Sequence, residues 1–414
     1  MWFNTWFRRH SSQAKARQAS SPWKTRSRRV RPRLEQLEDR SLPSNFFAAT
    51  TADLIAEINL ANKDGRTNTI TLTAPTTSPY VLTAVDNTTN GANGLPVIAN
   101  KDILTIVGNG DTIDASGYGR LFDVANGGSL TLENLMLQHG WAFGSGAASE
   151  GGAIYNQGTL VLSAVTVQGN VAQGSDGVSK KNGTGTPGNA AAGGGIWSNG
   201  SLTLENGSLV QNNQAIAGNG GDGPGGVGGD ASGGGLYMAG GTSKLVGVTV
   251  NNNIAQGGQG STFPTNPPCP CTGRNPDGSG YGGGLYVSSG TLTTSSDTLD
   301  GNQAIYLISD GETRAFGGGI FVANGTVNLS SDVVDSNQAR GTGGGNSNDG
   351  GGGIFIGGGT VSLCNETVEY NITDGSGGGI LIYGSTVYID SFTVANSINN
   401  ANGNIEGSYI LQTC

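Results

Sequence analysis

Charged and aromatic residues are scarce in this sequence. Of its 414 residues, 12% are Asp, Glu, Lys or Arg and 7% are Phe, Trp or Tyr. A helical bundle or a coiled coil contains a much larger share of Glu, Lys, Leu and Ala, so the composition disfavours both. Only 13 residues are proline and no strict Gly-X-Y period occurs, which excludes collagen.

Histidine and long apolar runs are also scarce. His10 and His139 are the only two histidines, which argues against most histidine-based catalysis and against zinc binding. No run reaches 18 consecutive apolar residues, so the sequence predicts no transmembrane segment.

The charge is divided unevenly along the chain. The formal net charge is −9, but residues 1–40 contain 11 Lys and Arg against three acidic residues. The remainder contains 10 Lys and Arg against 27 acidic residues, a net charge of −17. This acidic part disfavours nucleic-acid binding, which needs clustered basic side chains, and tolerates divalent cations. We interpret residues 1–45 as a disordered basic export or sorting segment; binding of this segment to an anionic membrane surface or to nucleic acid is the alternative.

Four cysteines leave the disulfide state open. Cys269 and Cys271 flank a single proline, and they give only a weak zinc signal because no histidine or second cysteine pair lies nearby. A strained Cys269–Cys271 disulfide, a Cys364–Cys414 disulfide and free thiols are all compatible with the sequence.

A short amphipathic helix is predicted ahead of the β-rich part. Within residues 51–62, Leu54, Ile58 and Ala61 recur on one helical face, and threonines precede them as candidate N-caps. We assign residues 46–100 to an N-terminal cap that contains this helix and the first strands, because the end of a solenoid needs to be covered.

A repeated phrase dominates the sequence from residue 151 onward. Each copy opens with Gly-Gly-(Ala/Gly)-(Ile/Leu), continues through a turn and a short apolar segment, and ends in Asn. From the opening Ile or Leu to the Asn is 16 residues in the first copy and 17 in the next five, whereas 9 to 32 residues separate that Asn from the next opening. The openings end at Ile154, Ile196, Leu236, Leu285, Ile320, Ile354 and Ile380. The copies end at Asn170, Asn213, Asn253, Asn302, Asn337 and Asn371, with Asn396 as a less regular seventh.

This pattern predicts an all-β fold: a single-stranded parallel β-helix over residues 101–414 with about nine or ten rungs. We expect three short strands per rung, an amide ladder formed by the terminal Asn side chains, and Gly-rich inserts that leave one corner as flexible loops. Residues 121–140 form a weaker extra rung. The apolar residues three positions before each Asn should form one inward stack: Val167, Val210, Val250, Leu299, Val334 and Val368.

The repeats resemble the polymorphic outer-membrane-protein repeats and related right-handed β-helix repeats of bacterial surface proteins. The opening motifs and the terminal Asn match, whereas the Phe that the family has three residues before the Asn is Val or Leu here. Residues 31–40, Arg-Pro-Arg-Leu-Glu-Gln-Leu-Glu-Asp-Arg, look like the N-terminal element of large secreted proteins of planctomycete bacteria. Together the resemblances imply an exported right-handed β-helix, located outside the cell or on its surface, and they imply no enzyme.

The residue after each opening Ile or Leu is aromatic in six copies. Because side chains alternate across a strand, we expect these rings to point outward as a ladder beside the inserts, where sugar rings would stack on them. The alternative is that the rings stack on one another beneath the inserts and stabilise the sheet. The six candidate glycan-binding residues are Tyr155, Trp197, Tyr237, Tyr286, Phe321 and Phe355, and Leu381 takes the seventh position.

Two acidic columns are the candidate calcium ligands. In register, carboxylates on successive rungs stand about 4.8 Å apart, and such like charges destabilise a sheet unless a cation such as Ca²⁺ neutralises them. The alternative is a solvated acidic face with loosely held counterions. The first column is Asp297, Asp332 and Glu366, five residues before each Asn, and the second is Asp300, Asp335 and Glu369, two residues before it.

The sequence therefore predicts an exported, cell-surface-associated β-helix with a structural, adhesive or glycan-binding role and no evident catalytic site. The alternative is a carbohydrate-active enzyme, a polysaccharide lyase or a hydrolase, because Arg314 and Arg340 lie in loops near the acidic rungs. A fold alone does not decide between them. Calcium is the one cofactor that the pattern suggests, and the sequence predicts no oligomeric state.

Overall fold

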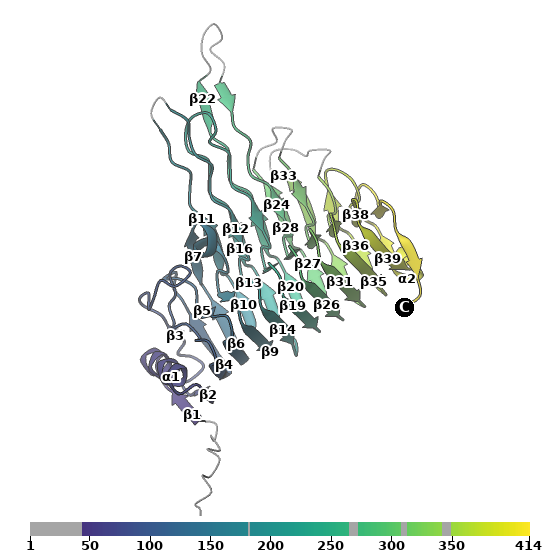
Figure 1. Cartoon of the computed structure of the whole chain (residues 1–414). Helices are drawn as coiled ribbons and strands as arrows, with labels where there is room; N and C mark the ends of the chain where they lie inside the picture. Colours follow the sequence, from purple (N-terminus) through teal and green to yellow (C-terminus); the bar gives the residue numbers. More distant parts are fainter. Residues whose placement is uncertain (1–43, 181–182, 265–271, 308–312, 342–348) are drawn as a thin grey trace, which may run out of the picture. The chain divides into compact units, whose positions relative to one another are not determined.

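The structure, a computed structural model, describes residues 44–414 except 181–182, 265–271, 308–312 and 342–348. The chain divides into two units, Met1–Leu42 and Pro43–Cys414, and only the second is described. Apart from residues 44 and 45, the predicted export segment lies outside the described residues. The second unit is a parallel β-helix, which confirms the fold predicted from the repeats (Figure 1).

A helix covers the N-terminal end of the stack. It is α1 (Thr51–Asp64), which confirms the helix predicted at 51–62. Thr50 Oγ1 accepts a hydrogen bond from the Asp53 amide at 3.2 Å, and Gly65 ends the helix in the left-handed region. The apolar face, including Leu54 and Ile58, is fully buried. The helix therefore closes one end of the hydrophobic core.

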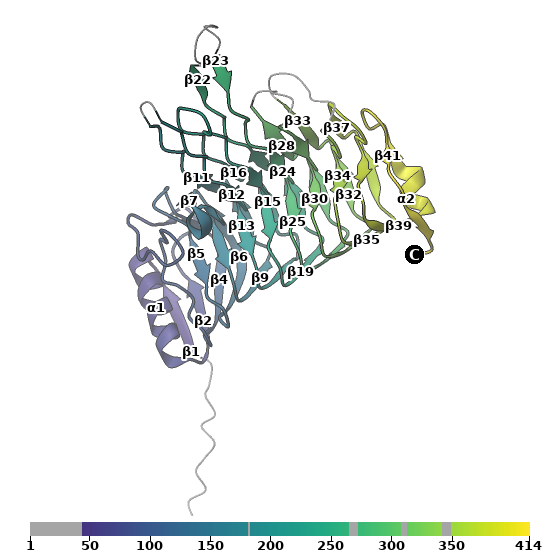
Figure 2. The same cartoon turned by 45° about the horizontal axis from the view of Figure 1, so that its top comes forward.

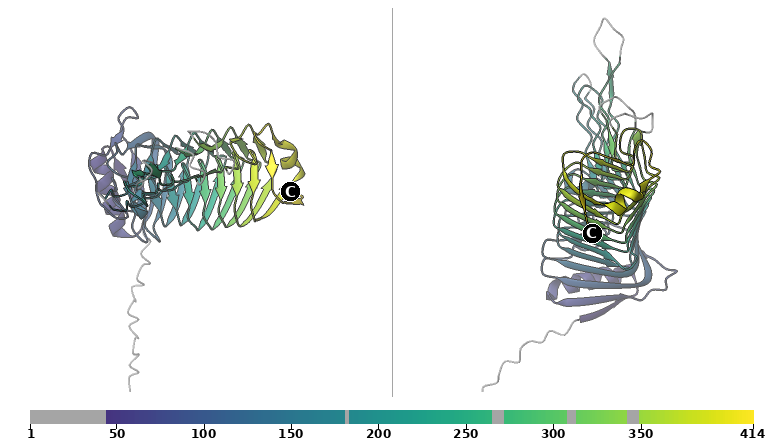
Figure 3. Two further views of the ribbon diagram at one scale, coloured as in Figure 1. Left: turned by 90° about the horizontal axis from the view of Figure 1, so that it is seen from above. Right: turned by 90° about the vertical axis from the view of Figure 1, so that its right-hand side faces the viewer.

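The longest stack of parallel strands runs the length of the described unit (Figure 3). It already begins with β1 (Ser44–Ala48) and β2 (Thr67–Leu72), which pair with each other, and β2 pairs with β4. From residue 101 onward it contains ten strands, in agreement with nine or ten rungs. They are β4 (Ile103–Asp114), β6 (Ser129–Gln138), β9 (Thr159–Ser163), β14 (Ser201–Glu205), β19 (Thr242–Val246), β26 (Thr291–Ser295), β31 (Thr326–Ser330), β35 (Thr360–Cys364), β39 (Thr386–Asp390) and β42 (Ile410–Gln412).

The other predicted strands of each rung form two further stacks. The strands at the opening motifs are β5 (Phe122–Val124), β8 (Ile154–Asn156), β13 (Ile196–Ser198), β18 (Leu236–Met238), β25 (Leu285–Val287), β30 (Ile320–Val322), β34 (Ile354–Ile356), β38 (Ile380–Ile382) and β41 (Ile405–Glu406). The strands before the Asn residues are β10 (Thr166–Gln168), β15 (Leu209–Gln211), β20 (Thr249–Asn251), β27 (Thr298–Asp300), β32 (Val333–Asp335), β36 (Thr367–Glu369) and β40 (Ser397–Ile398). The predicted inward apolar stack lies on this last set and is buried throughout.

Seven of the described rungs also contain strands that the sequence did not predict. A fourth strand follows the Asn corner, and four rungs have a two-residue return strand. The fourth strands are β7 (Trp141–Gly144), β11 (Val171–Gly174), β16 (Gln214–Ile216), β21 (Ile254–Gln256), β28 (Gln303–Tyr306), β33 (Gln338–Gly341) and β37 (Ile372–Thr373). The return strands are β12 (Ala191–Ala192), β17 (Ala231–Ser232), β24 (Gly280–Tyr281) and β29 (Ala315–Phe316). The remaining elements are β3 (Tyr80–Val81), a 3-10 turn (Gly146–Ser149), the antiparallel hairpin β22 (Thr262–Pro264) and β23 (Thr272–Arg274), and α2 (Ser391–Asn396).

The terminal Asn side chains form the predicted ladder. Asn302, for example, accepts hydrogen bonds through Oδ1 from the backbone amide and the side-chain amide of Asn253, both at 3.0 Å, and donates to Val250 O at 2.8 Å. The pattern repeats from Asn170 to Asn371 and satisfies the buried corner of each rung. After Asn371 the ladder continues at Asn400, not Asn396, because α2 interrupts the repeat and Asn396 ends that helix. Asn400 in turn donates through its backbone and side-chain amides to Asn404 Oδ1.

The opening glycines are required for two different reasons. Gly193 has a φ of +63°, a conformation that L-residues rarely adopt. Gly194 lies where two rungs approach so closely that a Cβ would stand 2.2 Å from Gly234 O. Strained backbone and stacking distance together explain why both positions recur as glycine.

The Gly-rich inserts are hydrogen-bonded to one another, so the prediction of separate flexible loops is wrong for their described parts. They extend from one side of the stack, near the hairpin β22–β23 (Figures 1 and 2). The amide of Gly177 donates to Asn219 O at 2.7 Å, and that of Gly220 donates to Gln259 O at 2.8 Å. A Cβ at Gly188 would stand 1.9 Å from Gly218 O. Glycine here allows backbones to pack directly against each other.

A disulfide joins Cys364 to Cys414, with Cα atoms 5.8 Å apart. It ties the end of β35 to the last residue of the chain described, beside β42, which pairs with β39. One of the pairings compatible with the sequence is thereby confirmed. Cys269 and Cys271 lie outside the described residues.

Candidate functional site

The six aromatic residues after the opening motifs form a continuous stack. They are in register on neighbouring strands from β8 to β34. Consecutive ring centroids lie 4.4–6.5 Å apart, and the ring planes deviate by only 2–12°. Each inner ring therefore has a neighbouring ring on both faces.

Most of this aromatic column is buried. Tyr155, Trp197, Phe321 and Phe355 are 5–8% exposed, and Tyr237 and Tyr286 are half-buried. Burial raises the pKa of Tyr155 to about 12. Because ring faces inside the column are occupied, sugar rings have no free face to stack on there. The geometry is that of the alternative, a column that stabilises the sheet.

The return strands supply a second aromatic row that covers the column. Tyr281 of β24 packs against Phe321 with centroids 5.3 Å apart, and Phe316 of β29 packs against Phe355 at 4.4 Å. This row was missed because the return strands are only two residues long and vary in sequence, so no periodic pattern marks them.

The two ends of the aromatic column differ. At the N-terminal end, the guanidinium of the fully buried Arg120 lies 5.1 Å from the centre of the Tyr155 ring. Its Nη2 donates to Ala147 O at 2.7 Å and to Glu150 O at 2.8 Å, which fixes it there. At the other end, Leu381 follows Phe355 in register, and no ring covers the last position among the described strands.

A hollow of about 440 Å³ lies at this open end. Phe316, Phe355 and the 74% exposed Tyr383 supply aromatic surface, and the polar side chains come from four successive rungs. The hollow is lined by Arg314, Phe316, Asp349, Phe355, Ser376, Leu381, Tyr383 and Glu406. Of these residues, Phe355 was predicted from the sequence as a glycan-binding residue, and Arg314 was named as a loop residue near the acidic rungs. The other lining residues were not predicted, although the change from an aromatic residue to Leu381 marks the rung at which the column ends.

Asp349 is the one buried acid in the hollow's lining. One carboxylate oxygen accepts a hydrogen bond from the Ala315 amide at 2.9 Å, and the other accepts one from the Tyr306 hydroxyl at 3.1 Å. Asp349 therefore holds the return strand β29 in place. Arg314 and Glu406 are exposed and reach the rim.

The first acidic column is buried, so the alternative of a solvated acidic face is wrong for it, and calcium binding at this column stays a prediction. Asp297, Asp332 and Glu366 are at most 1% exposed. Each accepts a hydrogen bond from a backbone amide of the preceding rung: Asp297 from Val248 at 2.7 Å, Asp332 from Asp297 at 2.8 Å, and Glu366 from Asp332 at 3.1 Å. These carboxylates take the place of a backbone acceptor at a corner of the core.

Burial strongly disfavours the charged forms of this column. Burial, together with the charge of Asp332, raises the pKa of Asp297 to about 7 and that of Glu366 to about 9. Within the described residues, Glu366 Oε1 has no hydrogen-bond partner. The column is thus most stable when it is largely protonated.

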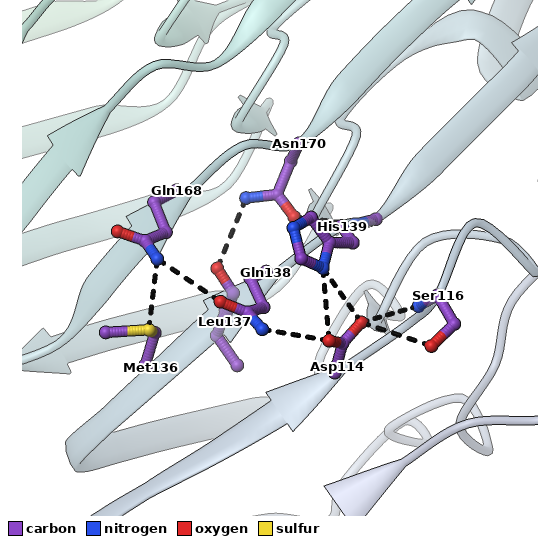
Figure 4. Close-up of polar contacts among 9 residues, drawn as sticks. Asp114, Ser116, Met136, Leu137, Gln138, His139, Gln168 and Asn170 are labelled. Carbon is purple, nitrogen blue, oxygen red and sulfur yellow. Dashed lines mark hydrogen bonds and ion pairs between the residues drawn. The ribbon is translucent and has the colours of Figure 1, made fainter. Parts of the chain in front are cut away.

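The second acidic column continues a ladder of amides on the outer face. Gln138 donates to Asp114 at 2.8 Å and Gln168 donates to Gln138 at 3.2 Å (Figure 4). On the next rung, Gln211 donates to Gln168 at 2.8 Å. Amides can donate and accept in turn along such a ladder, whereas carboxylates cannot.

Three rungs of carboxylates follow, with Asp300, Asp335 and Glu369 in direct register and half-buried. Burial and the neighbouring Asp335 raise the pKa of Asp300. In the part of the chain that the structure describes, no three His, Cys, Asp or Glu residues are arranged to hold a metal ion. Calcium binding at this column stays a prediction.

Comparison of the chain with protein-family models, with curated proteins and with solved structures gave no match. The resemblance to polymorphic outer-membrane-protein repeats therefore stays a prediction. Among the described residues, no helix is both long enough and apolar enough to cross a membrane.

Proposed function

We propose that this chain is an exported, surface-associated β-helix that binds a glycan in the hollow at the open end of the aromatic column. One observation carries the proposal: the hollow combines exposed aromatic surface with a cation, Arg314, and a carboxylate, Glu406, at its rim. Sugars have apolar C–H faces that pack on aromatic rings and hydroxyls that hydrogen-bond charged side chains. The proposed role, glycan binding, is the one predicted from the sequence, but the proposed binding site is the hollow at the end of the aromatic column and not the column itself.

Two features support export. The Cys364–Cys414 disulfide is of a kind that persists in oxidising compartments, outside the reducing cytosol. The resemblance of residues 31–40 to an export element points the same way. Neither feature identifies how the protein is attached to a surface.

A carbohydrate-active enzyme is the second candidate, because Asp349, Glu406 and Arg314 share one hollow. Glycoside hydrolysis uses two carboxyl groups across the scissile bond. Both oxygens of Asp349 already accept hydrogen bonds within the protein, which suits a positioning role better than proton transfer. Binding is therefore the function that the geometry supports best.

A glycan array with the full chain tests the proposal. Tyr383→Ala and Arg314→Ala should each remove the bound glycans, because both side chains are exposed in the hollow. Tyr370→Ala is the matched control, since Tyr370 is 53% exposed and lies outside the lining. Equal binding by all three variants would show that the hollow is not the site.

The enzyme candidate is tested on the same glycans. Release of new reducing ends or of unsaturated sugars by the full chain, abolished in Glu406→Gln, would replace binding with catalysis as the function. Binding without product release supports the proposal as stated.

A further inference from the structure

A second group of aromatic side chains is exposed at the other end of the solenoid. Tyr118 is 49%, Trp141 40% and Phe143 49% exposed, in contrast to the buried column. They line a groove of about 270 Å³ together with Val85, Ala92, Gly117 and Gly119. The sequence pattern did not single out these residues, because they precede the first complete repeat.

Strand β7 presents two of the rings side by side. Ala142 is buried, so Trp141 and Phe143, on either side of it, both point outward. Their centroids lie 5.2 Å apart with the planes tilted by 31°, so the rings splay instead of stacking face to face. Trp141 Nε1 donates to Gln173 Oε1 at 3.1 Å, which orients the indole.

The opposite walls of the groove are held by backbone hydrogen bonds. The Gly117 amide donates to His139 O at 2.9 Å, and the Trp141 amide donates to Gly119 O at 2.9 Å. The turn that carries Tyr118 is thereby fixed one rung before Trp141. The groove is therefore formed before any ligand arrives, which lowers the entropic cost of binding.

We propose that the groove formed by Tyr118, Trp141 and Phe143 binds an uncharged sugar ring of a neutral glycan. No lining residue carries a charge, and the net charge of −17 over residues 41–414 repels polyanions. A pyranose presents one apolar face and a rim of hydroxyls, so it covers exposed rings in an open groove while its hydroxyls stay in water. A wholly apolar ligand would leave its outer face exposed to water, and a stable protein partner needs a much larger contact area.

The proposal concerns a separate site, and it refines the proposed function by naming a neutral glycan as the ligand class. The groove lies at β7, the first strand of its stack, whereas the hollow lies beside β34 and β38. Variants of the groove and of the hollow can therefore be scored independently.

Isothermal titration calorimetry of the full chain with cellohexaose, mannohexaose and hexagalacturonic acid tests the inference. At least one neutral hexasaccharide should bind, and hexagalacturonic acid should not bind at the groove. Trp141→Ala and Phe143→Ala should each weaken the neutral interaction about tenfold, the effect of losing one aromatic contact. Tyr370→Ala, an exposed position outside both linings, should leave this interaction unchanged. Thermal unfolding checks that each variant is folded. If a groove variant does not fold, Tyr118→Ala is measured in its place.

Three results would overturn the inference. The first is an affinity for the neutral hexasaccharide that neither Trp141→Ala nor Phe143→Ala changes. The second is binding of the hexasaccharide that only Tyr383→Ala removes, which would assign the binding to the hollow alone. The third is self-association of the chain that Trp141→Ala abolishes, which would make the groove an interface between copies. If groove variants lose binding while hollow variants retain every glycan on the array, the inference stands and the proposed hollow site fails.

Discussion

Replacement of Asp332 by Asn should stabilise the protein, and more so as the pH rises. Asp332 is the middle member of the buried column between Asp297 and Glu366. Its Oδ1 accepts the Asp297 amide and its Oδ2 accepts the Thr294 hydroxyl. In the Asp332→Asn variant, the new side chain keeps the first bond through its Oδ1, and its Nδ2 donates to the same hydroxyl oxygen. The substitution therefore removes a charge and keeps the hydrogen bonds to the Asp297 amide and to the Thr294 hydroxyl.

The size and sign of the effect follow from the pKa values. In the unfolded chain these carboxyls ionise near pH 4, whereas burial delays ionisation of Asp297 to about pH 7 and of Glu366 to about pH 9. Between these limits the folded protein binds more protons than the unfolded chain, so its stability falls as the pH rises. The raised pKa of Asp297 alone corresponds to a loss of about 4 kcal/mol. Removing the central charge should recover about 1–3 kcal/mol at pH 9 and almost nothing at pH 4.

Urea unfolding followed by circular dichroism at pH 4, 6, 7.5 and 9 measures this gain. Asp335→Asn is the matched control, because it removes the same charge from β32 at a half-buried outer position. A gain for D332N that is the same at pH 4 and pH 9, or no larger than that for D335N at pH 9, would refute the assignment of the column as a buried, protonated ladder.

Three further predictions concern the core and the ends of the solenoid. Asn302→Ala leaves the Asn253 amides and Val250 O without their hydrogen-bond partners, so it should lower the free energy of urea unfolding by about 3 kcal/mol. Asn324→Ala, on an exposed turn, is the control and should lower it far less. Gly194→Ala places a Cβ 2.2 Å from Gly234 O and should abolish soluble expression, whereas Gly183→Ala, whose closest contact is a Lys180 side-chain atom at 3.2 Å, should be tolerated. Cys364→Ser removes a disulfide that spans 50 residues and should lower the free energy of unfolding by about 4 kcal/mol, the value expected from chain entropy. A urea-unfolding midpoint of the unsubstituted protein that dithiothreitol leaves unchanged would contradict this prediction.

The periodic part of the fold was predictable because each column repeats at nearly constant spacing. The interval of 17 residues from opening to Asn places Val250, Leu299 and their equivalents in register, and the structure confirms that stack and the Asn ladder. Alternation within a strand explains why Asp300 and Asp335, each next to a buried inward residue, lie on an outer face. The same rule does not apply to Asp297, which lies in the turn before β27, where the chain bends and the side chain points inward.

The sites could not be predicted because they occur where the repeat stops. Within the column, each aromatic ring from Trp197 to Phe321 has a neighbouring ring on both faces, so no ring face is free for a sugar ring. Free surface arises only where a column ends without a cover, as at Leu381, or before the column begins, as at Trp141. At the one end where a side chain does close the column, Arg120 directs its donors to backbone carbonyls and leaves no comparable opening. In a solenoid of this kind, the positions that break the period are therefore the first places to search for binding, and Tyr383 and Trp141 are the two side chains whose removal tests that principle directly.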